Sequence, residues 1–155
     1  MSIPERLERD MVAAAKARDS VRLGVIRYLR SELKNRAIEL GDELSEDDCV
    51  GVLSRVAKGH REAIEQAEAQ NRAEIVGREK SQLAIVEEYL PEALSPGELE
   101  ALVDEVIEEV SASGPRDMGL VMKTIMPRVK GRAEGGAVKE IVGARLSSRR
   151  EAEER

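Results

Sequence analysis

Aromatic residues are nearly absent from this chain of 155 residues, which has two tyrosines and no phenylalanine or tryptophan. Its hydrophobic fraction is nevertheless 41%. The core must therefore be built from Leu, Ile, Val, Met and Ala, which favours packed helices over a β-sandwich. The lack of aromatic rings also argues against a surface on which the bases of single-stranded nucleic acid would stack.

Cysteine and long apolar runs are equally scarce. The single cysteine, Cys49, excludes an internal disulfide framework and fits a reducing cytoplasm. No apolar run approaches the roughly 18 residues of a membrane span. The first ten residues, MSIPERLERD, are charged and lack the apolar stretch of a secretory signal. We therefore expect a soluble cytoplasmic protein with no membrane partner.

Motifs for catalysis and for metal or nucleotide binding are missing. The chain has no HExxH, no paired CxxC, no GxGxxG, no P-loop and no GxSxG. His60, the only histidine, lies on the apolar side of a predicted helix, where packing is favoured over acid–base chemistry. Cys49 lies in the first turn of that helix, whose dipole could lower its pKa, but an ordinary half-buried cysteine is favoured. We expect no catalytic residues, metal or cofactor.

Apolar residues recur in steps of three and four along the chain, and this period predicts seven helices. Five polar residues stand where helix N-caps are expected: Ser2, Asp19, Ser45, Ser95 and Asp117. Gly41 and Gly131 are expected to end helices in a left-handed conformation. The seventh helix is expected to bury Ala137, Val138, Ile141, Val142 and Leu146.

The proline-containing stretch YLPEALSPGE, residues 89–98, predicts a domain boundary. The resulting fold class is all-α. We expect an N-terminal bundle of long helical hairpins over residues 1–92 and a small three-helix domain over residues 93–148. Residues 149–155 are expected to form a frayed polar tail.

Charge is distributed unevenly around a net value of −6. Residues 1–115 carry 15 Lys/Arg against 25 Asp/Glu, whereas residues 116–150 carry nine against three. Residues 18–38 form a second basic segment, with six basic and two acidic side chains. Two basic patches on an acidic body favour an anionic partner. The alternative is a solvated helix surface with no partner.

The most informative local stretch is MPRVKGRAEGG, residues 126–136, where cations surround a turn that opens onto the seventh helix. Free backbone N–H groups at a helix N-terminus, with cations beside them, suit phosphate. The glycines are also what a plain joint between two helices requires. If RNA binds here, we expect recognition of its backbone and shape.

Nearly the whole chain, about residues 1–147, resembles the YqeY family, also called GatB/YqeY domain proteins. The segments that carry the resemblance are LERDMVAAAKARDSVRLGVIRYLRSELKN, REAIEQAEAQNRAEIV, LAIVEEYLPEALSPGELEALV and DMGLVMKTIMPRVKGRAEG. EEYLP, followed by DMG-x-VM and a basic MP-x-VKGRA turn, is specific to that family. One departure is RAEGG in place of an expected RADGK, which puts Glu134 and Gly136 where a better capping residue and a basic residue are expected.

The family's C-terminal half resembles the tail domain of the B subunit of the glutamine-dependent tRNA amidotransferase. That tail contacts tRNA and lies apart from the chemistry. The resemblance therefore implies tRNA, or a tRNA-processing enzyme, as a partner. It also carries the label of carbon–nitrogen ligase activity with glutamine as amido-N-donor. Because nothing here matches an amidase Ser/Lys core or the B subunit's ATP-using site, we interpret that label as inherited from the larger complex.

Our first hypothesis is a non-catalytic accessory protein that binds tRNA or a tRNA–enzyme complex. The predicted phosphate contacts in the C-terminal domain are Lys123, Arg128, Lys130, Arg132, Lys139 and Arg145. Arg22, Arg27 and Arg30 are predicted either to extend that surface or to dock a protein. The alternatives are a protein–protein interaction module with no RNA role and an amidotransferase component that takes part in amide transfer.

Overall fold

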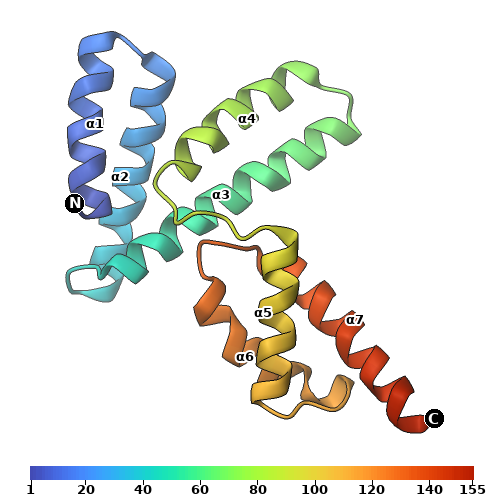
Figure 1. Ribbon diagram of the computed structural model, residues 1–155. Helices are drawn as coiled ribbons and strands as arrows, with labels where there is room; N and C mark the ends of the chain where they lie inside the picture. Colours follow the sequence, from blue (N-terminus) through green and yellow to red (C-terminus); the bar gives the residue numbers. More distant parts are fainter. The chain divides into compact units, whose positions relative to one another are not determined.

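The structure, a computed structural model, describes all residues 1–155 and contains helices and no strands, which confirms the all-α prediction (Figure 1). The α-helices are α1 (Ile3–Ala17), α2 (Ser20–Leu40), α3 (Glu46–Ala69), α4 (Ala73–Glu87), α5 (Pro96–Glu109), α6 (Met118–Val129) and α7 (Gly135–Glu154). A short 3₁₀ turn, η1 (Pro115–Asp117), precedes α6. None of the helices has the length and apolar character that a membrane crossing requires.

The chain divides into two compact units, each with its own hydrophobic core. The N-terminal unit is Met1–Pro91 and the C-terminal unit is Glu92–Arg155. The predicted boundary lies after residue 92, inside the segment that joins α4 to α5.

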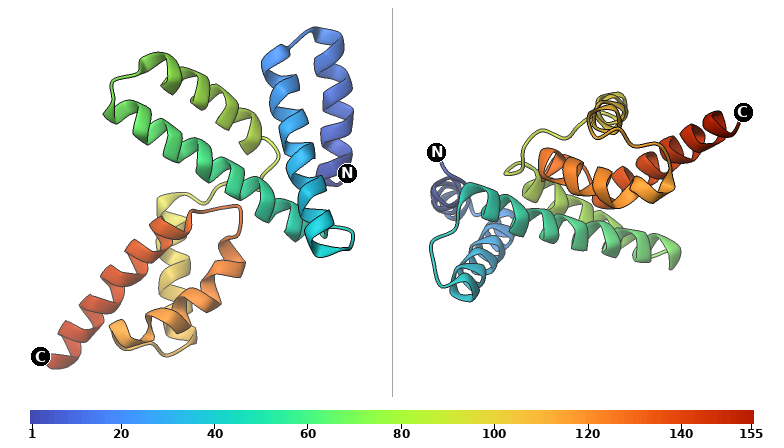
Figure 2. Two further views of the ribbon diagram at one scale, coloured as in Figure 1. Left: turned by 180° about the vertical axis from the view of Figure 1, so that it is seen from behind. Right: turned by 90° about the horizontal axis from the view of Figure 1, so that it is seen from below.

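Two helical hairpins, α1–α2 and α3–α4, make up the N-terminal unit, and the helices of each hairpin lie side by side (Figures 1 and 2). Its core contains the fully buried side chains of Leu7, Ile26, Leu29 and Leu53. Tyr89, just after α4, is the one aromatic side chain in this core. The long helices thus bury an almost entirely aliphatic seam, as the composition predicted.

Local signals fix where these helices begin and end. The Ser2 side chain accepts a hydrogen bond from the backbone of Glu5, whose carboxylate accepts one from the Ser2 backbone. Ser45 forms the same reciprocal cap with Asp48. Gly41 ends α2 at a φ of +70°, in the left-handed region that favours glycine. The N-caps predicted at Ser2 and Ser45 and the stop predicted at Gly41 are confirmed.

Three helices, α5, α6 and α7, form the C-terminal unit. Its core is aliphatic: the fully buried residues are Val103, Val106, Val121, Ile125, Val129, Val138, Val142 and Leu146. The Ser95 side chain caps α5 by accepting from the Glu98 backbone, as predicted. Gly131 has a φ of +75° just after α6, which confirms its predicted left-handed conformation.

Three expectations for the C-terminal unit are wrong. Ala137, expected on the buried face of α7, is exposed. Asp117 does not cap α6, because its carboxylate accepts from the Ser113 backbone at 2.8 Å and closes the turn before η1 instead. Residues 149–154, expected to fray as a polar tail, continue α7. The reason is that Arg149 donates to the Ala112 carbonyl and pairs with Glu108, which ties this part of α7 to the end of α5.

Candidate nucleic-acid interface

The turn between α6 and α7 is held by its own backbone and by the start of the C-terminal unit. The Arg132 and Ala133 amides donate to the Val129 carbonyl at 2.7 and 3.0 Å. The Arg132 carbonyl accepts from the Leu94 amide at 2.9 Å, and Arg132 Nε donates to the Glu92 carbonyl at 3.0 Å. Arg132, predicted to contact phosphate, therefore has part of its guanidinium committed to fixing this turn.

The N-terminus of α7 follows this turn directly. Glu134 occupies the N-cap position, but its side chain makes no capping hydrogen bond. The amides of the first helical turn, at Gly135, Gly136 and Ala137, have no intrahelical acceptor, as at the start of any α-helix, and Glu134 does not cap them. Such amides can donate to an anion.

Helix α5 offsets the charge of several arginines in the C-terminal unit. It carries six carboxylates and no basic residue. Arg128 of α6 lies 2.8 Å from Glu109, and Arg145 of α7 lies 3.0 Å from Asp104. Two predicted phosphate contacts, Arg128 and Arg145, are therefore already paired with carboxylates of the same unit.

Three of the contacts predicted in the C-terminal unit stay unpaired: Lys123, Lys130 and Lys139 are exposed and have no ion-pair partner. The buried line of α7 runs through Val138, Val142 and Leu146. At about 100° per residue, Lys139 and Arg145 fall on opposite sides of that line. Since Arg145 pairs with α5, Lys139 lies on the flank that faces away from it. We call Lys123, Lys130 and Lys139 the free lysines. Arg116 of η1, which sequence reasoning missed, is also exposed and unpaired.

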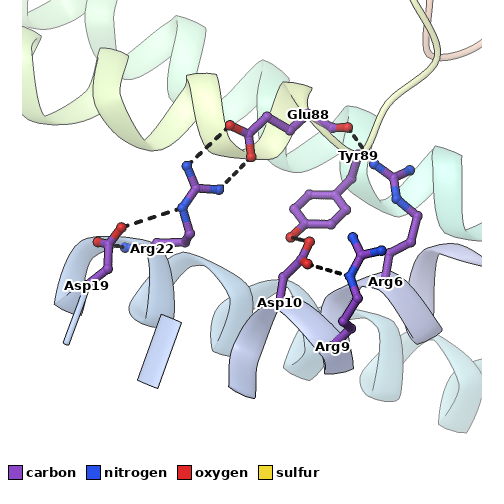
Figure 3. A network of polar contacts seen from close by, with 7 residues as sticks. All are labelled: Arg6, Arg9, Asp10, Asp19, Arg22, Glu88 and Tyr89. Carbon is purple, nitrogen blue, oxygen red and sulfur yellow. Dashed lines mark hydrogen bonds and ion pairs between the residues drawn. The ribbon is translucent and has the colours of Figure 1, made fainter. Parts of the chain in front are cut away.

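Arg22, predicted either to extend the RNA surface or to dock a protein, pairs within the N-terminal unit. Its guanidinium makes two hydrogen bonds to the Glu88 carboxylate, at 2.5 and 3.2 Å, and lies 3.5 Å from Asp19 (Figure 3). This pairing joins α2 to the segment that follows α4. Of the other two predicted residues, Arg30 contacts the Met11 sulfur at 2.9 Å, and Arg27 is exposed with no partner.

Tyr89 forms the other half of the same polar network. Its hydroxyl donates to Asp10 at 2.6 Å, and Arg9 donates to the other Asp10 oxygen at 2.8 Å (Figure 3). Arg6 lies over the Tyr89 ring, 5.0 Å from its centroid, and donates to the Glu88 carbonyl. Burial and the Asp10 hydrogen bond raise the pKa of Tyr89, while hydrogen bonds from Arg9 and Tyr89 lower that of Asp10. The EEYLP segment thus has a structural role.

The only histidine and the only cysteine belong to α3. His60 Nδ1 lies 2.6 Å from a carboxylate oxygen of Glu79 on α4, so the imidazole links the two helices of a hairpin. Cys49 is 1% exposed, more buried than the half-buried residue we expected. Burial, with the nearby charges of Glu46 and Asp48, raises the pKa of its thiol. The lowering that the helix dipole could cause is therefore overridden.

Comparison with known proteins places these features in a family. The sequence model described as Yqey-like protein matches residues 4–146, almost the whole chain. The chain belongs to the YqeY family. The match extends from α1 into α7, so it includes both the Tyr89 network and the turn between α6 and α7.

Several fungal YqeY relatives share the name "Altered inheritance of mitochondria protein 41, mitochondrial". The protein of Lachancea thermotolerans is 31% identical over 112 residues, which are 70% of this chain and 60% of that protein. That of Pyrenophora tritici-repentis is 26% identical over 148 residues, covering 90% of this chain and 81% of the relative. That of Kluyveromyces lactis is 26% identical over 146 residues, covering 92% and 77%.

Proposed function

We propose that this YqeY-family chain is a non-catalytic accessory protein that binds tRNA or a tRNA–enzyme complex through its C-terminal unit. The observation that carries the proposal is that carboxylates of α5 neutralise some cations of this unit and leave others unpaired. Arg128 and Arg145 are paired with its carboxylates, whereas the three free lysines are not. The resemblance to the amidotransferase tail domain supports RNA as the anionic partner.

The proposed contact is between lysines and the phosphate backbone. Lysine binds phosphate as a point charge, and the amides at the start of α7 add donors beside the turn. The C-terminal unit contains no aromatic residue, so bases have no ring on which to stack. We therefore expect binding that depends on charge and RNA shape and falls steeply as salt increases.

The test is fluorescence anisotropy of labelled tRNA titrated at several salt concentrations, with a generic duplex RNA measured alongside. Lys130→Ala combined with Lys139→Ala should weaken tRNA binding and flatten the logarithmic salt slope by about two units, since each lost phosphate contact removes roughly one. The matched control is Arg128→Ala with Arg145→Ala, which also removes two cations but should change the slope much less. Equal slopes for the two double variants would refute the role of the free lysines.

The non-catalytic part of the proposal has a separate test. Purified protein supplied with glutamine, ATP and glutamyl-tRNA should leave the aminoacyl-tRNA unconverted, and conversion would favour a direct part in amide transfer. We place the role in the cytoplasm, because a single free and buried cysteine fits a reducing compartment. The relatives' name says mitochondrial, so fractionation of cells that express the tagged protein checks the compartment.

A further inference from the structure

A cleft of about 430 Å³ opens in the N-terminal unit between α2, α3 and α4. Its walls are formed by Gly24, Val25, Tyr28, Glu32, Arg55, Val56, Gly59, His60 and Gln82. None of these is a proposed RNA contact. The volume lies within the range of small-molecule sites, which run from about 300 to 1,000 Å³.

Two glycines on different helices keep this cleft open. A Cβ built at Gly24 of α2 or at Gly59 of α3 would meet no atom within 4 Å. Neither glycine has a positive φ, so backbone conformation does not require glycine at either position. Within a helix each costs about 1 kcal/mol relative to alanine. What the two positions provide is space, bordered by the apolar side chains of Val25 and Val56.

Opposite charges line the cleft without neutralising one another. Glu32 belongs to α2 and Arg55 to α3, and neither has an ion-pair partner or a side-chain hydrogen bond. This contrasts with Arg22 on the same unit, whose charge is matched by Glu88. A carboxylate and a guanidinium that share a cleft but remain unpaired offer two separate attachment points for a ligand of mixed charge.

The remaining walls supply a ring and a fixed polar group. Tyr28 is 53% exposed, which makes it one of the few large apolar side chains open to solvent. His60 is held by Glu79 through Nδ1, and its Nε2 has no partner. A held imidazole is pre-organised for a hydrogen bond to a ligand. The amide of Gln82 adds a donor and an acceptor.

We propose that this cleft binds a small zwitterionic molecule. Its carboxylate pairs with Arg55, its ammonium pairs with Glu32, and its apolar part packs against Val25, Val56 and the Tyr28 ring. Arginine suits a carboxylate because its planar guanidinium can donate two parallel hydrogen bonds, and an ammonium near a tyrosine ring gains a cation–π contact. This site is independent of the proposed RNA contact and belongs to the other unit.

The test uses three probes that share a phenylethyl skeleton: L-phenylalanine, phenethylamine, which lacks the carboxylate, and 3-phenylpropanoate, which lacks the ammonium. Binding is followed by NMR titration of the full chain, with the single histidine as a reporter inside the cleft. We expect L-phenylalanine to bind at least about tenfold more tightly than either relative, because each loses one charge-assisted contact. Equal affinities for the three probes, or no shift up to about 10 mM L-phenylalanine, would overturn the proposal.

Variants assign the contacts. Arg55→Gln should weaken L-phenylalanine about tenfold and leave phenethylamine unchanged, and Glu32→Gln should weaken L-phenylalanine and leave 3-phenylpropanoate unchanged. Gly59→Leu should fill the cleft and abolish binding, while the better helix former keeps the protein folded. Gly77→Leu is the matched control, since a Cβ at Gly77 of α4 also meets open space but lies outside the cleft. Retained binding in Gly59→Leu would contradict the site.

Discussion

The two units use the same charged residue types for different purposes. In the N-terminal unit, Arg22 and Arg9 hold carboxylates that belong to a network around Tyr89, which is only 2% exposed. In the C-terminal unit the core is entirely aliphatic, and Arg128 and Arg145 pair with carboxylates at the surface of α5. Arginines of the first unit therefore pair with carboxylates around a buried tyrosine, whereas those of the second pair with carboxylates on a helix surface, and in both units the arginine side chains stay partly exposed.

This difference shows why a count of basic residues misleads about function. Residues 18–38 and residues 116–150 both have basic charge in the sequence. Arg22 in the first segment is already committed to Glu88, and Arg145 in the second is committed to Asp104. Unpaired cations occur in both segments, Arg27 in the first and the free lysines in the second. What distinguishes the second segment is that Lys130 and Lys139 lie on either side of the N-terminus of α7, which has no side-chain cap.

The largest expected effect tests whether the units are energetically separate. Leu53 in the N-terminal unit and Leu146 in the C-terminal unit are both fully buried. Leu→Ala at either should lower the free energy of unfolding of its own unit by about 2–5 kcal/mol, through lost burial and a cavity. Native-state hydrogen exchange should show faster exchange in the substituted unit alone. Loss of protection in both units from either substitution would show that they unfold together.

A smaller expected effect is a loss of stability at high pH in the N-terminal unit alone. Since the pKa of Tyr89 is raised in the folded state, the native protein holds this proton at pH values where the unfolded chain has lost it. Stability contributed by Tyr89 is complete below the unfolded pKa of about 10 and falls above it by about 1.4 kcal/mol per pH unit. The C-terminal unit has no tyrosine and should not share this loss.

Urea unfolding at pH 9 and pH 11 measures the difference. Tyr89→Phe should lower the free energy of unfolding at pH 9 by about 1.5–3 kcal/mol, because a hydrogen bond to a carboxylate is lost, and should remove this part of the alkaline sensitivity. Tyr28→Phe is the matched control, since the Tyr28 hydroxyl makes no hydrogen bond. An unchanged alkaline slope in Tyr89→Phe would show that other groups cause it.

Local features were predictable from sequence, and the site was predictable only in part. The reciprocal caps at Ser2 and Ser45 and the left-handed Gly131 follow from residues within a few positions of each other. Asp117 was assigned wrongly because Ser113, four residues away, competes for its carboxylate. Local spacing shows which residues can cap a helix, but it does not show which of two nearby backbone amides a carboxylate accepts from.

Pairings between helices were beyond local reasoning. Tyr89 and Asp10 are 79 residues apart, and Arg145 and Asp104 are 41 apart. These contacts depend on which helix faces pack together, which the apolar period of a single helix does not specify. For that reason the sequence predicted Arg22, Arg128 and Arg145 as contacts for a partner and did not reveal the carboxylate that each pairs with in the folded chain.

Each unit has one glycine in the left-handed region, so the same substitution can be compared in both. Gly41 and Gly131 have φ values of +70° and +75°. Alanine at either should cost about 1–2 kcal/mol, because a Cβ is disfavoured in that region. Chemical denaturation should show similar losses for Gly41→Ala and Gly131→Ala. Only Gly131→Ala should also weaken tRNA binding, since it alters the turn between Lys130 and α7, and equal binding by both variants would separate the turn from the interface.

The smallest expected effect on stability comes from removing the carboxylates of α5 that pair with arginines of the C-terminal unit. Asp104→Asn combined with Glu109→Gln leaves Arg145 and Arg128 without their nearest carboxylates. The stability cost should be below about 1 kcal/mol per pair, because both pairs are at the surface. Two released arginines should strengthen tRNA binding and steepen the logarithmic salt slope, by at most about two units, if both reach phosphate. An unchanged slope would mean that the α5 flank does not face RNA, and the free lysines alone would then define the contact.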